Sequence, residues 1–257
     1  MEMEIEFLGV GEACDPTCYN TALLVAAGRG ATRQYILLDC GFTTPHRYFL
    51  CRHDPDQLAA VWISHFHGDH FLGIPLLLLR FWEMGRTRPL LLLGPSGVGG
   101  KVEQAVKLAY PFFRQRLRYP LRYIEVGSDT ELVEAGCRWH FAAMEHAQPS
   151  LGVHLAADGV SLFYSGDGRA TVASRFLAEG CHCLVHEAYG LEEAPPNHGT
   201  VAQCLSLAAE SGCRRLALVH VGHAARTRLM SELPAMVERA GLKGKVFLPE
   251  PGEVWRL

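Results

Sequence analysis

A cluster of histidines and one aspartate lies directly after a short apolar segment near residue 65. The apolar segment, Val61-Trp62-Ile63, is expected to form a buried β-strand, and it is followed by Ser64-His65-Phe66-His67-Gly68-Asp69-His70. A flat strand sends alternate side chains to opposite faces of a sheet, whereas a turn at its end can gather three imidazoles and a carboxylate. Zinc, manganese and iron all accept these ligands. The segment therefore predicts a metal site at the end of a buried strand.

Three further polar residues each follow an apolar strand directly: His146, Asp167 and His220. One turn cannot complete the coordination of two ions, so the remaining ligands must come from other loops. Loops at strand ends commonly carry functional side chains on a rigid scaffold. The repeated placement of a polar residue after a strand makes these three residues candidates for the remaining ligands.

Apolar strands and helical segments recur in two blocks along the chain. The expected strands are Ile5–Leu8, Ala22–Ala26, Tyr35–Asp39, Val61–Ser64, Trp139–Ala143, Gly152–Ala156, Ser161–Ser165, Leu184–Glu187 and Leu216–Val219. The expected helices are Leu72–Met84, Gly100–Tyr110, Ala170–Glu179, Val201–Ser211 and Leu229–Ala240. Two strand blocks with helices predict an α+β protein in which two sheets pack together with helices outside. With 49% hydrophobic residues and no linker-like segment, residues 1–257 are expected to form a single domain.

The composition bears on where the protein works. The first residues, Met1-Glu2-Met3-Glu4, are acidic, which is the wrong charge for a secretory signal. The longest apolar stretch, Phe71–Leu79, contains Pro75 and is too short to span a bilayer. Nine cysteines, an odd number with scattered spacing, do not resemble a disulfide framework. We therefore expect a cytoplasmic protein with no membrane partner.

Positive charge is concentrated in one segment of a chain whose net charge is −3. Arg80–Arg122 contains nine Lys or Arg against two acids, and Phe112–Tyr123 alternates arginines with aromatic residues. That combination suits contact with nucleic-acid phosphates and stacked bases. A solvated surface with inward-packed aromatics, a homodimer contact or a substrate lid would give the same pattern, so these alternatives stay open.

The His-x-His-x-Asp-His motif, followed by His146, Asp167 and His220 in that order, resembles the metallo-β-lactamase superfamily over essentially the whole chain. Further segments resemble its ribonuclease Z branch: Phe7–Gly11, Leu38–Gly41, Pro149–Gly152, Ser165–Asp167, His186–Ala188 and Asn197–Thr200. The resemblance implies a four-layer αββα sandwich with two divalent metal ions at one edge. Zinc is the first choice of metal, and manganese or iron is compatible with the same ligands.

The resemblance also implies a role for each candidate residue. The implied ligands are His65, His67 and His146 for one ion, Asp69, His70 and His220 for the other, and Asp167 as the bridge. Asp69 is also counted as catalytic, together with Glu187 and His198, the pair that would deliver a proton to the leaving group. As structural alternatives, Glu187 could be a carboxylate held by backbone amides, and His198 a residue at a helix start. Asp39 is expected to support the metal-binding turn.

Two departures from the ribonuclease Z pattern concern substrate recognition. That branch carries a long transfer-RNA-binding arm before the bridging Asp, whereas only twenty residues separate His146 from Asp167. The branch also has a Ser and then an Arg within four residues of the last His, whereas Arg226 comes two positions later than that. We therefore expect a dinuclear hydrolase without the arm.

The preferred substrate is a small or cyclic phosphodiester, or short nucleic acid. Two divalent ions lower the pKa of a shared water and offset charge on a phosphoryl oxygen. His67, where redox relatives carry a glutamate, favours hydrolysis over electron transfer. The alternatives are hydrolysis of a lactone, thioester, sulfate ester or β-lactam, and an RNA-processing or RNA-binding subunit.

Overall fold

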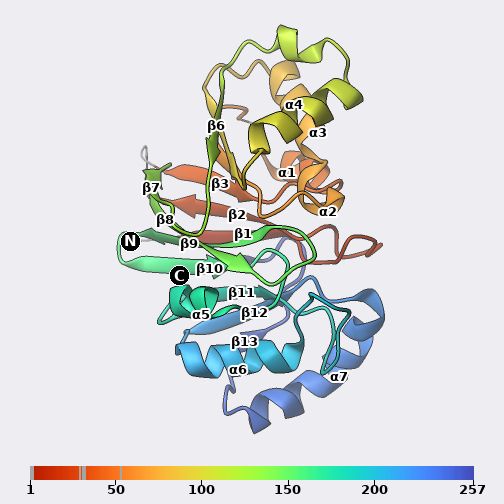
Figure 1. Ribbon diagram of the computed structural model, residues 1–257, viewed down its shortest axis with the longest axis vertical. Coiled ribbons are helices and arrows are strands. Elements are labelled where there is room, and N and C mark those ends of the chain that lie inside the picture. Colours follow the sequence, from red (N-terminus) through yellow and green to blue (C-terminus); the bar gives the residue numbers. More distant parts are fainter. Residues whose placement is uncertain (1–2, 29, 31–32, 53) are drawn as a thin grey trace.

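The computed structural model describes residues 3–28, 30, 33–52 and 54–257, and it contains two seven-stranded β-sheets packed face to face (Figure 1). Helices cover both outer faces of the pair of sheets. This arrangement confirms the expected α+β fold with four αββα layers. The acidic start of the chain includes Met1 and Glu2, which lie outside the described residues.

The first sheet has the strand order β14-β1-β2-β3-β4-β5-β6. Its strands are β1 (Glu4–Gly9), β2 (Ala22–Ala27), β3 (Gln34–Leu38), β4 (Leu58–Trp62), β5 (Leu90–Gly94), β6 (Leu121–Glu125) and β14 (Val254–Arg256). Strands β3 to β6 run parallel to one another. Because parallel strands end at the same edge, the residues after β3 and β4 emerge side by side.

The second sheet has the strand order β13-β12-β11-β10-β9-β8-β7. Its strands are β7 (Glu131–Glu134), β8 (Cys137–Met144), β9 (Ser150–Ala157), β10 (Val160–Tyr164), β11 (Cys183–Glu187), β12 (Arg215–Val219) and β13 (Val246–Phe247). Strands β10 to β13 are parallel, and β8, β9 and β10 form an antiparallel meander. The twenty residues between His146 and Asp167 are thus almost filled by β9, a tight turn and β10, with no room for an arm.

The helices divide between the two outer faces. The first sheet carries α1 (Thr44–Cys51), α2 (Gly68–Phe71), α3 (Ile74–Glu83), α4 (Val98–Ala109) and the 3-10 helix η2 (Phe113–Arg116). The second sheet carries α5 (Val172–Ala178), α6 (Val201–Ser211) and α7 (His223–Arg239). Helix α6 has the predicted bounds, because Thr200 caps its N-terminus through the Gln203 amide and Gly212 ends it at φ 65°.

The central core lies between the two sheets. Trp62 of β4, Trp139 of β8 and Tyr164 of β10 are fully buried there, and the Trp62 and Tyr164 ring centroids are 6.1 Å apart. Burying side chains of this size contributes much of the free energy of folding and fixes how the two sheets face each other. The polar loops at one edge of the sheets are therefore placed by a rigid apolar core.

Several elements differ from the sequence-based expectation. Helix α1 and strands β5, β6, β7, β13 and β14 were not among the expected elements. Helix α7 begins at His223 rather than at Leu229 and contains Pro234. Within the described residues, no helix combines the length and apolar character needed to cross a membrane. The single domain over residues 1–257 stays a prediction.

Candidate metal centre

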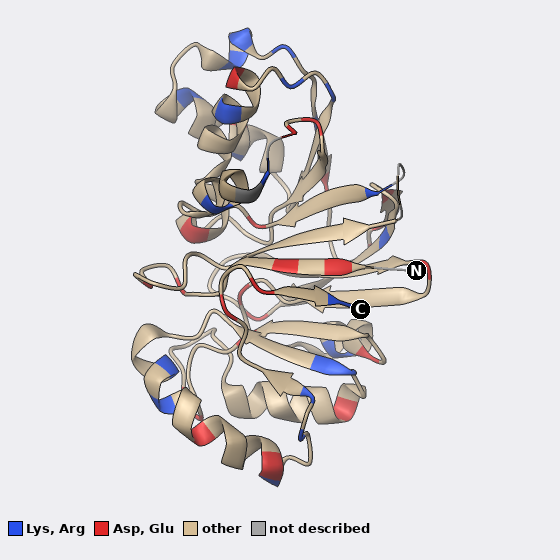
Figure 2. Cartoon of the chain, turned by 180° about the vertical axis from the view of Figure 1, so that it is seen from behind, with Lys and Arg blue, Asp and Glu red and all other residues tan. Residues whose placement is uncertain are grey.

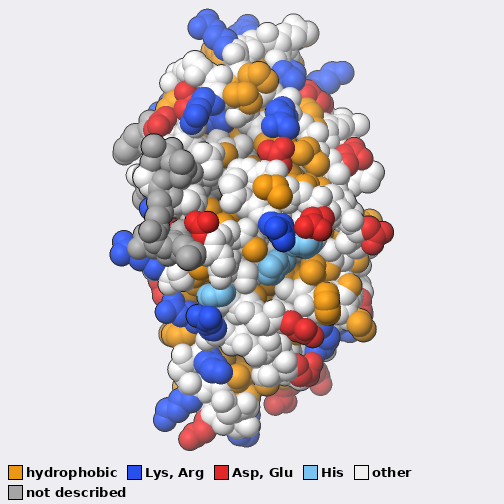
Figure 3. All heavy atoms as spheres, turned by 90° about the vertical axis from the view of Figure 1, so that its left-hand side faces the viewer, with side chains coloured by type: hydrophobic (Ala, Val, Ile, Leu, Met, Phe, Trp, Pro, Cys, Tyr) orange, Lys and Arg blue, Asp and Glu red, His pale blue; other side chains and the backbone are white. Residues whose placement is uncertain are grey.

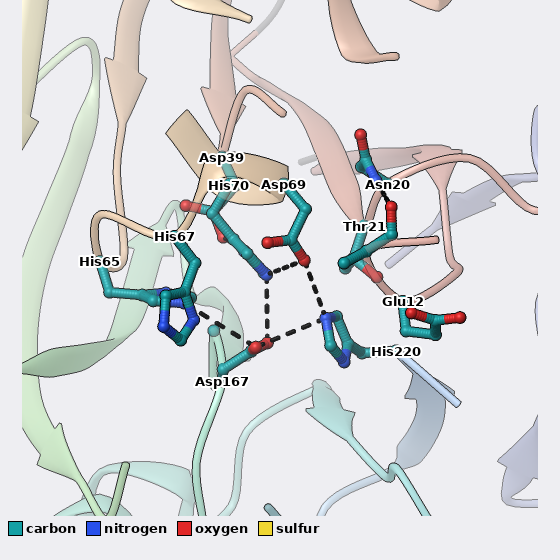
Figure 4. A network of polar contacts seen from close by, with 12 residues as sticks. Glu12, Asn20, Thr21, Asp39, His65, His67, Asp69, His70, Asp167 and His220 are labelled. Carbon is teal, nitrogen blue, oxygen red and sulfur yellow. Dashed lines mark hydrogen bonds and ion pairs between the residues drawn. The ribbon is translucent and has the colours of Figure 1, made fainter. Parts of the chain in front are cut away.

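The candidate ligands meet at one edge of the two sheets, where four strands end. His65, His67, Asp69 and His70 follow β4, His146 follows β8, Asp167 follows β10 and His220 follows β12. Figure 4 shows Asp167 between His65 and His67 on one side and Asp69, His70 and His220 on the other. The structure thus brings together all seven residues that the sequence singled out.

Three imidazoles form the first group. His65 Nε2 lies 3.0 Å from His67 Nδ1, and His146 Nε2 lies 3.2 Å from the same Nδ1 atom. His146 Nδ1 lies 3.1 Å from the backbone oxygen of Asn197, which can only accept a hydrogen bond. The proton of the His146 ring is therefore assigned to Nδ1, and Nε2 presents a lone pair to the other two rings.

Asp69, His70 and His220 form the second group. Asp69 Oδ2 lies 3.3 Å from His70 Nε2 and 3.3 Å from His220 Nε2. His70 and His220 are buried, and Asp69 is 7% exposed. His220 has a positive φ of 53°, and its backbone N–H donates to the Val10 carbonyl oxygen. That strained backbone turns the imidazole out of the strand direction and toward Asp69.

Asp167 faces both groups. Its Oδ1 lies 3.3 Å from His70 Nε2, while its Oδ2 lies 3.4 Å from His220 Nε2 and 3.8 Å from His65 Nε2. Gly166 and Gly168 flank it at positive φ, and a Cβ atom at Gly166 would lie 2.5 Å from the Ser64 Cβ. Glycine is required at that position, because only it allows the Asp167 turn to approach the turn after β4.

Asp39 supports the turn that carries the cluster. Its carboxylate accepts hydrogen bonds from the Ser64 backbone N–H at 2.7 Å, the Ser64 hydroxyl at 2.8 Å and the Tyr164 hydroxyl at 2.8 Å. His70 Nδ1 lies 2.8 Å from the same carboxylate. This contact assigns the proton to Nδ1 and leaves Nε2 of His70 free to act as a ligand. Asp39 thus has the supporting position expected from the sequence.

The buried charges shift one another's pKa values. Burial, followed by the charge of His70, holds the pKa of His65 well below its ordinary value. Burial would raise the pKa values of Asp69 and Asp167, but neighbouring imidazoles, including that of His220, hold both well below the ordinary value. The pKa values of His70 and His220 are raised despite burial, with Asp167 the strongest contributor. Ionised carboxylates packed among imidazoles are typical of functional sites.

These residues fit two divalent cations. The donor atoms of His65, His67, His146 and Asp167 all lie within 4.8 Å of one another, and so do those of Asp69, His70, Asp167 and His220. Buried polar atoms without a partner are costly, yet His70 Nε2 and Asp167 Oδ1 have no hydrogen-bond partner among the described residues. Two imidazole-carboxylate groups that share one carboxylate suit zinc, manganese or iron, and they do not select among them.

Glu187 and His198 lie beside the second group. The buried Glu187 accepts hydrogen bonds from the backbone N–H groups of Gly168, Gly199 and Tyr189. Glu187 is therefore held by backbone amides, as the structural alternative predicted, and it also lies close to His198. Glu187 Oε1 lies 3.4 Å from His198 Nδ1, which has no hydrogen-bond partner within the described part of the chain.

His198 is the more exposed member of this pair. Its side chain is 19% exposed, and its ring lies parallel to that of His220 with centroids 6.0 Å apart. The Tyr189 ring covers it at 5.0 Å. No role was predicted from the sequence for Tyr189 or for Tyr164, which is hydrogen-bonded to Asp39. Neither tyrosine stands in a motif, and the contact between Tyr164 and Asp39 joins residues 125 positions apart.

The Arg80–Arg122 segment lies away from the ligands, in a lobe built from α3, β5, α4, η2 and β6, where Figure 2 shows blue segments outnumbering red. Some of its cations are committed to local pairs, such as Arg114 with Glu103 at 2.8 Å. Arg86 is buried and donates to backbone carbonyl oxygens. Lys107, Arg116 and Arg118 are exposed and have no ion-pair partner among the described residues.

Arg226 does not reach the sheet edge where the seven candidate ligands meet, which we call the metal edge. It is buried, and its Nη2 lies 2.9 Å from Glu250 Oε1 and 3.3 Å from the Pro249 backbone oxygen. The late arginine that follows His220 therefore ties α7 to the segment before β14. It does not take the place expected of the ribonuclease Z arginine.

The fold and the donor set define a class of protein, an αββα sandwich whose sheet edge is suited to two metal ions. The chain belongs to the β-lactamase superfamily, because the model of the Beta-lactamase superfamily domain matches residues 34–221.

Comparison with known proteins also identifies the branch. The ribonuclease Z of Methanosarcina mazei is 26% identical over 275 residues, covering 85% of this chain and 87% of the relative. A ribonuclease BN of Escherichia coli is 28% identical over 277 residues, covering 85% and 89%. The ribonuclease Z-like resemblance is thereby confirmed.

Solved structures show the same fold. The metallo-β-lactamase fold protein YhfI from Bacillus subtilis superimposes with a TM-score of 0.81 at 19% identity, over 100% of both chains. The short form of human tRNase Z gives a TM-score of 0.75 at 22% identity, over 98% of both chains.

Proposed function

We propose that the chain is a metal-dependent hydrolase of phosphodiester bonds, with nucleic acid as its substrate class. The observation that carries the proposal is Asp167, whose two carboxylate oxygens face two separate groups of imidazole and carboxylate donors. The names of the relatives support it, since those proteins are ribonucleases Z and BN.

The proposed ligands divide into two sets that share Asp167. His65, His67 and His146 would hold one ion, and Asp69, His70 and His220 the other. Two such ions, when bound, lower the pKa of water so that hydroxide is available near neutral pH, and they offset charge on the phosphoryl oxygens. Asp69, whose Oδ2 lies 3.3 Å from His220 Nε2, is also proposed to accept a hydrogen bond from the attacking water.

His198 is proposed as the general acid. Its partly exposed ring can reach the leaving oxygen of a bound phosphodiester, and the Glu187 Oε1 atom lies 3.4 Å from its Nδ1. Glu187 is itself fixed by three backbone amides, so it can orient the imidazole without moving. Proton delivery to an alkoxide leaving group is worth roughly 10²–10⁴-fold in rate.

The proposal is tested by hydrolysis of bis(p-nitrophenyl) phosphate and of a short single-stranded RNA by zinc- and manganese-loaded protein. Asp167→Ala serves as the disabled variant, and Asp129→Ala, at an exposed turn, serves as the matched control. We expect turnover in wild type and Asp129→Ala and none in Asp167→Ala. Cleavage of a thioester or lactone panel with both phosphodiesters left intact would contradict the proposal.

A further inference from the structure

A polar pocket separate from the candidate ligands lies between α5 and α6 on the outer face of the second sheet. It has a volume of about 190 Å³, and we call it the α5–α6 pocket. Figure 1 shows α5 and α6 together over this face. His186 and Cys204 form its floor, and Glu145, Arg169, Arg175 and Gln203 stand around it. None of these side chains belongs to the proposed ligand set.

The floor of the α5–α6 pocket contains an unsatisfied polar atom. His186 is 2% exposed, and its Nδ1 lies 2.8 Å from the Glu187 backbone oxygen. A carbonyl oxygen only accepts, so the ring proton is assigned to Nδ1 and Nε2 remains an acceptor. Nε2 is buried and has no hydrogen-bond partner among the described residues. A ligand in this pocket would therefore be favoured by a hydrogen-bond donor that meets Nε2.

Two arginines give the pocket an anion-binding side. Arg169 donates from Nε to the His198 backbone oxygen at 2.9 Å, while its Nη1 is only loosely paired with Glu145 at 3.6 Å. Arg175 is held by Glu210, with 2.6 Å between Nη1 and Oε2. Each guanidinium carries five N–H donors, so both retain donors beyond these contacts. Glu145 at the rim disfavours a fully charged anion and favours one that keeps a proton.

The pocket is connected to His198 by a short chain of contacts. Arg169 holds the His198 carbonyl, and the backbone N–H of the adjacent Gly168 donates to Glu187 Oε1 at 3.0 Å. Gly199, next to His198, donates to the same Oε1 atom at 2.8 Å. A ligand that draws on the Arg169 guanidinium would therefore disturb the segment that positions His198.

We propose that the α5–α6 pocket binds a protonated phosphate group, either inorganic phosphate or the phosphomonoester end of a nucleotide, and that its occupancy lowers turnover through Arg169 and His198. Arg169 and Arg175 bind the phosphate oxygens, and the P–OH group donates to His186 Nε2. The link to turnover rests on the proposed function, because phosphodiester hydrolysis yields a phosphomonoester. The binding itself does not depend on that function.

The binding is tested by calorimetric titration of metal-loaded protein with inorganic phosphate and, separately, with adenosine 5′-monophosphate. Arg175→Gln removes a pocket cation, and Gln203→Glu adds a negative charge while keeping the capping box of α6, which accepts Glu or Gln. Arg228→Gln, an exposed arginine paired with Glu232 on α7, is the matched control. We expect each pocket variant to raise the Kd of one binding event about tenfold, as for loss of a charge-assisted hydrogen bond.

Kinetics separate this pocket from phosphate binding at the metal edge. We expect phosphate to lower kcat for bis(p-nitrophenyl) phosphate at least twofold in wild type and Arg228→Gln, beside any competitive effect on KM. In Arg175→Gln and Gln203→Glu the effect on kcat should disappear relative to each variant's own phosphate-free rate. A stronger response to the nucleotide than to inorganic phosphate would identify the phosphomonoester as the ligand.

The inference is overturned if both pocket variants keep the wild-type Kd and stoichiometry, or if phosphate acts only competitively in wild type. Variant-sensitive phosphate binding in a protein that hydrolyses no phosphodiester would contradict the proposed function and retain the pocket. Phosphodiester hydrolysis without any phosphate binding that responds to the pocket variants would support the proposed function and contradict the pocket.

Discussion

Two regions of the molecule are rich in polar residues: the metal edge and the lobe of α3, β5, α4, η2 and β6. They differ in how far those polar side chains are buried. At the metal edge, His65, His70 and Asp167 are buried among side chains from separate strands. In the lobe, Arg80 pairs with Glu83 one helical turn away, and both are about half exposed. Burial of charge is costly unless it is compensated, whereas exposed pairs contribute little. Buried polar residues are therefore the stronger evidence of function.

The lobe nevertheless keeps features that suit a partner. Phe112 is 76% exposed and Leu108 is 86% exposed, close to the exposed cations Lys107, Arg116 and Arg118. Phe113 and Tyr119 of the same segment are buried, so part of the aromatic pattern is core packing. The lobe thus has buried aromatic residues that pack inward and exposed apolar and cationic residues that could contact a partner. Contact with nucleic acid or with a second copy of the chain there stays a prediction.

The largest effect is expected at the residue shared by both ligand groups. Asp167→Ala should lower the rate of phosphodiester hydrolysis by at least about 10³-fold and reduce bound metal, because both groups lose a ligand. Metal content by plasma mass spectrometry and turnover should fall together. Retention of two ions with full activity would show that the metal edge does not work as a shared site.

His198→Ala should lower kcat by roughly 10²–10⁴-fold with metal content unchanged, because it removes the proposed proton donor. The loss should be smaller for a substrate with a good leaving group, such as p-nitrophenolate, than for RNA. If the variant instead loses metal, His198 is a ligand and the assignment of the general acid is wrong.

Asp39→Asn should weaken metal binding by about 10–100-fold, as expected when the partner of a ligating histidine is altered. An amide can accept from Tyr164 and Ser64, but it cannot match the carboxylate that holds His70 Nδ1. Competition with a chelator of known affinity measures the change. An unchanged metal affinity would mean that the apolar core alone orients the turn.

The lobe should affect macromolecular binding and leave small substrates untouched. Reversing both Arg116 and Arg118 to Glu should weaken RNA binding by roughly tenfold to a hundredfold at low salt and reduce its salt dependence. Turnover of bis(p-nitrophenyl) phosphate should stay within about twofold of wild type, because Arg116 and Arg118 are exposed and belong to neither group of candidate ligands. Unchanged RNA affinity would favour a homodimer contact, which sedimentation of the same variant would reveal.

His154 lies outside both regions and tests whether a buried histidine there affects the free energy of unfolding. Burial beside His140 lowers its pKa to about 4 in the folded protein. The unfolded chain therefore binds more protons between about pH 6.5 and 4, and stability is lost as pH falls through this window. The loss should be on the order of 1–2 kcal/mol, because one pKa unit is about 1.4 kcal/mol and the ring is partly exposed. Denaturant titration of wild type and His154→Gln should show the smaller pH dependence in the variant.

The opposite end of the molecule shows how ordinary exposed charge looks. Figure 3 views the end that carries the N-terminus, where Lys, Arg, Asp and Glu side chains of both signs are scattered over the surface.

Another pocket, of about 230 Å³, is also lined by several arginines. It includes Arg86, Arg88 and Arg122 together with Asp56 and Glu134. Arg122 pairs there with Glu134 at 3.1 Å. None of the described residues that line this pocket has an unsatisfied buried polar atom of the kind that distinguishes the α5–α6 pocket.

The candidate ligands were easier to identify from the sequence than the surrounding helices and strands. His65, His146, Asp167 and His220 each stand after a strongly apolar strand, and strand ends are easily recognised. Strand β5 has the uniform sequence Leu-Leu-Leu-Leu-Gly, which has no alternation to separate strand from helix. Helix α7 has a weakly apolar start and an internal proline, so its first six residues gave no helical pattern.

Contacts between distant residues were beyond prediction. The hydroxyl of Tyr164 meets Asp39 across the interface between the two sheets, and only the packing of the core sets that distance. Likewise, Arg169 follows the predicted Asp167, but its contact with the His198 carbonyl depends on the conformation of the loop before α6. Such partners require the folded chain.

The central claim is that two ions, held by groups that share Asp167, carry phosphodiester hydrolysis. The most direct measurement is titration of metal-free protein with zinc, and separately with manganese, while hydrolysis of bis(p-nitrophenyl) phosphate is followed. We predict that activity rises to a plateau at two ions per chain and that Asp167→Ala shows no such rise. Full activity at one ion per chain, or activity that is independent of added metal, would contradict the account.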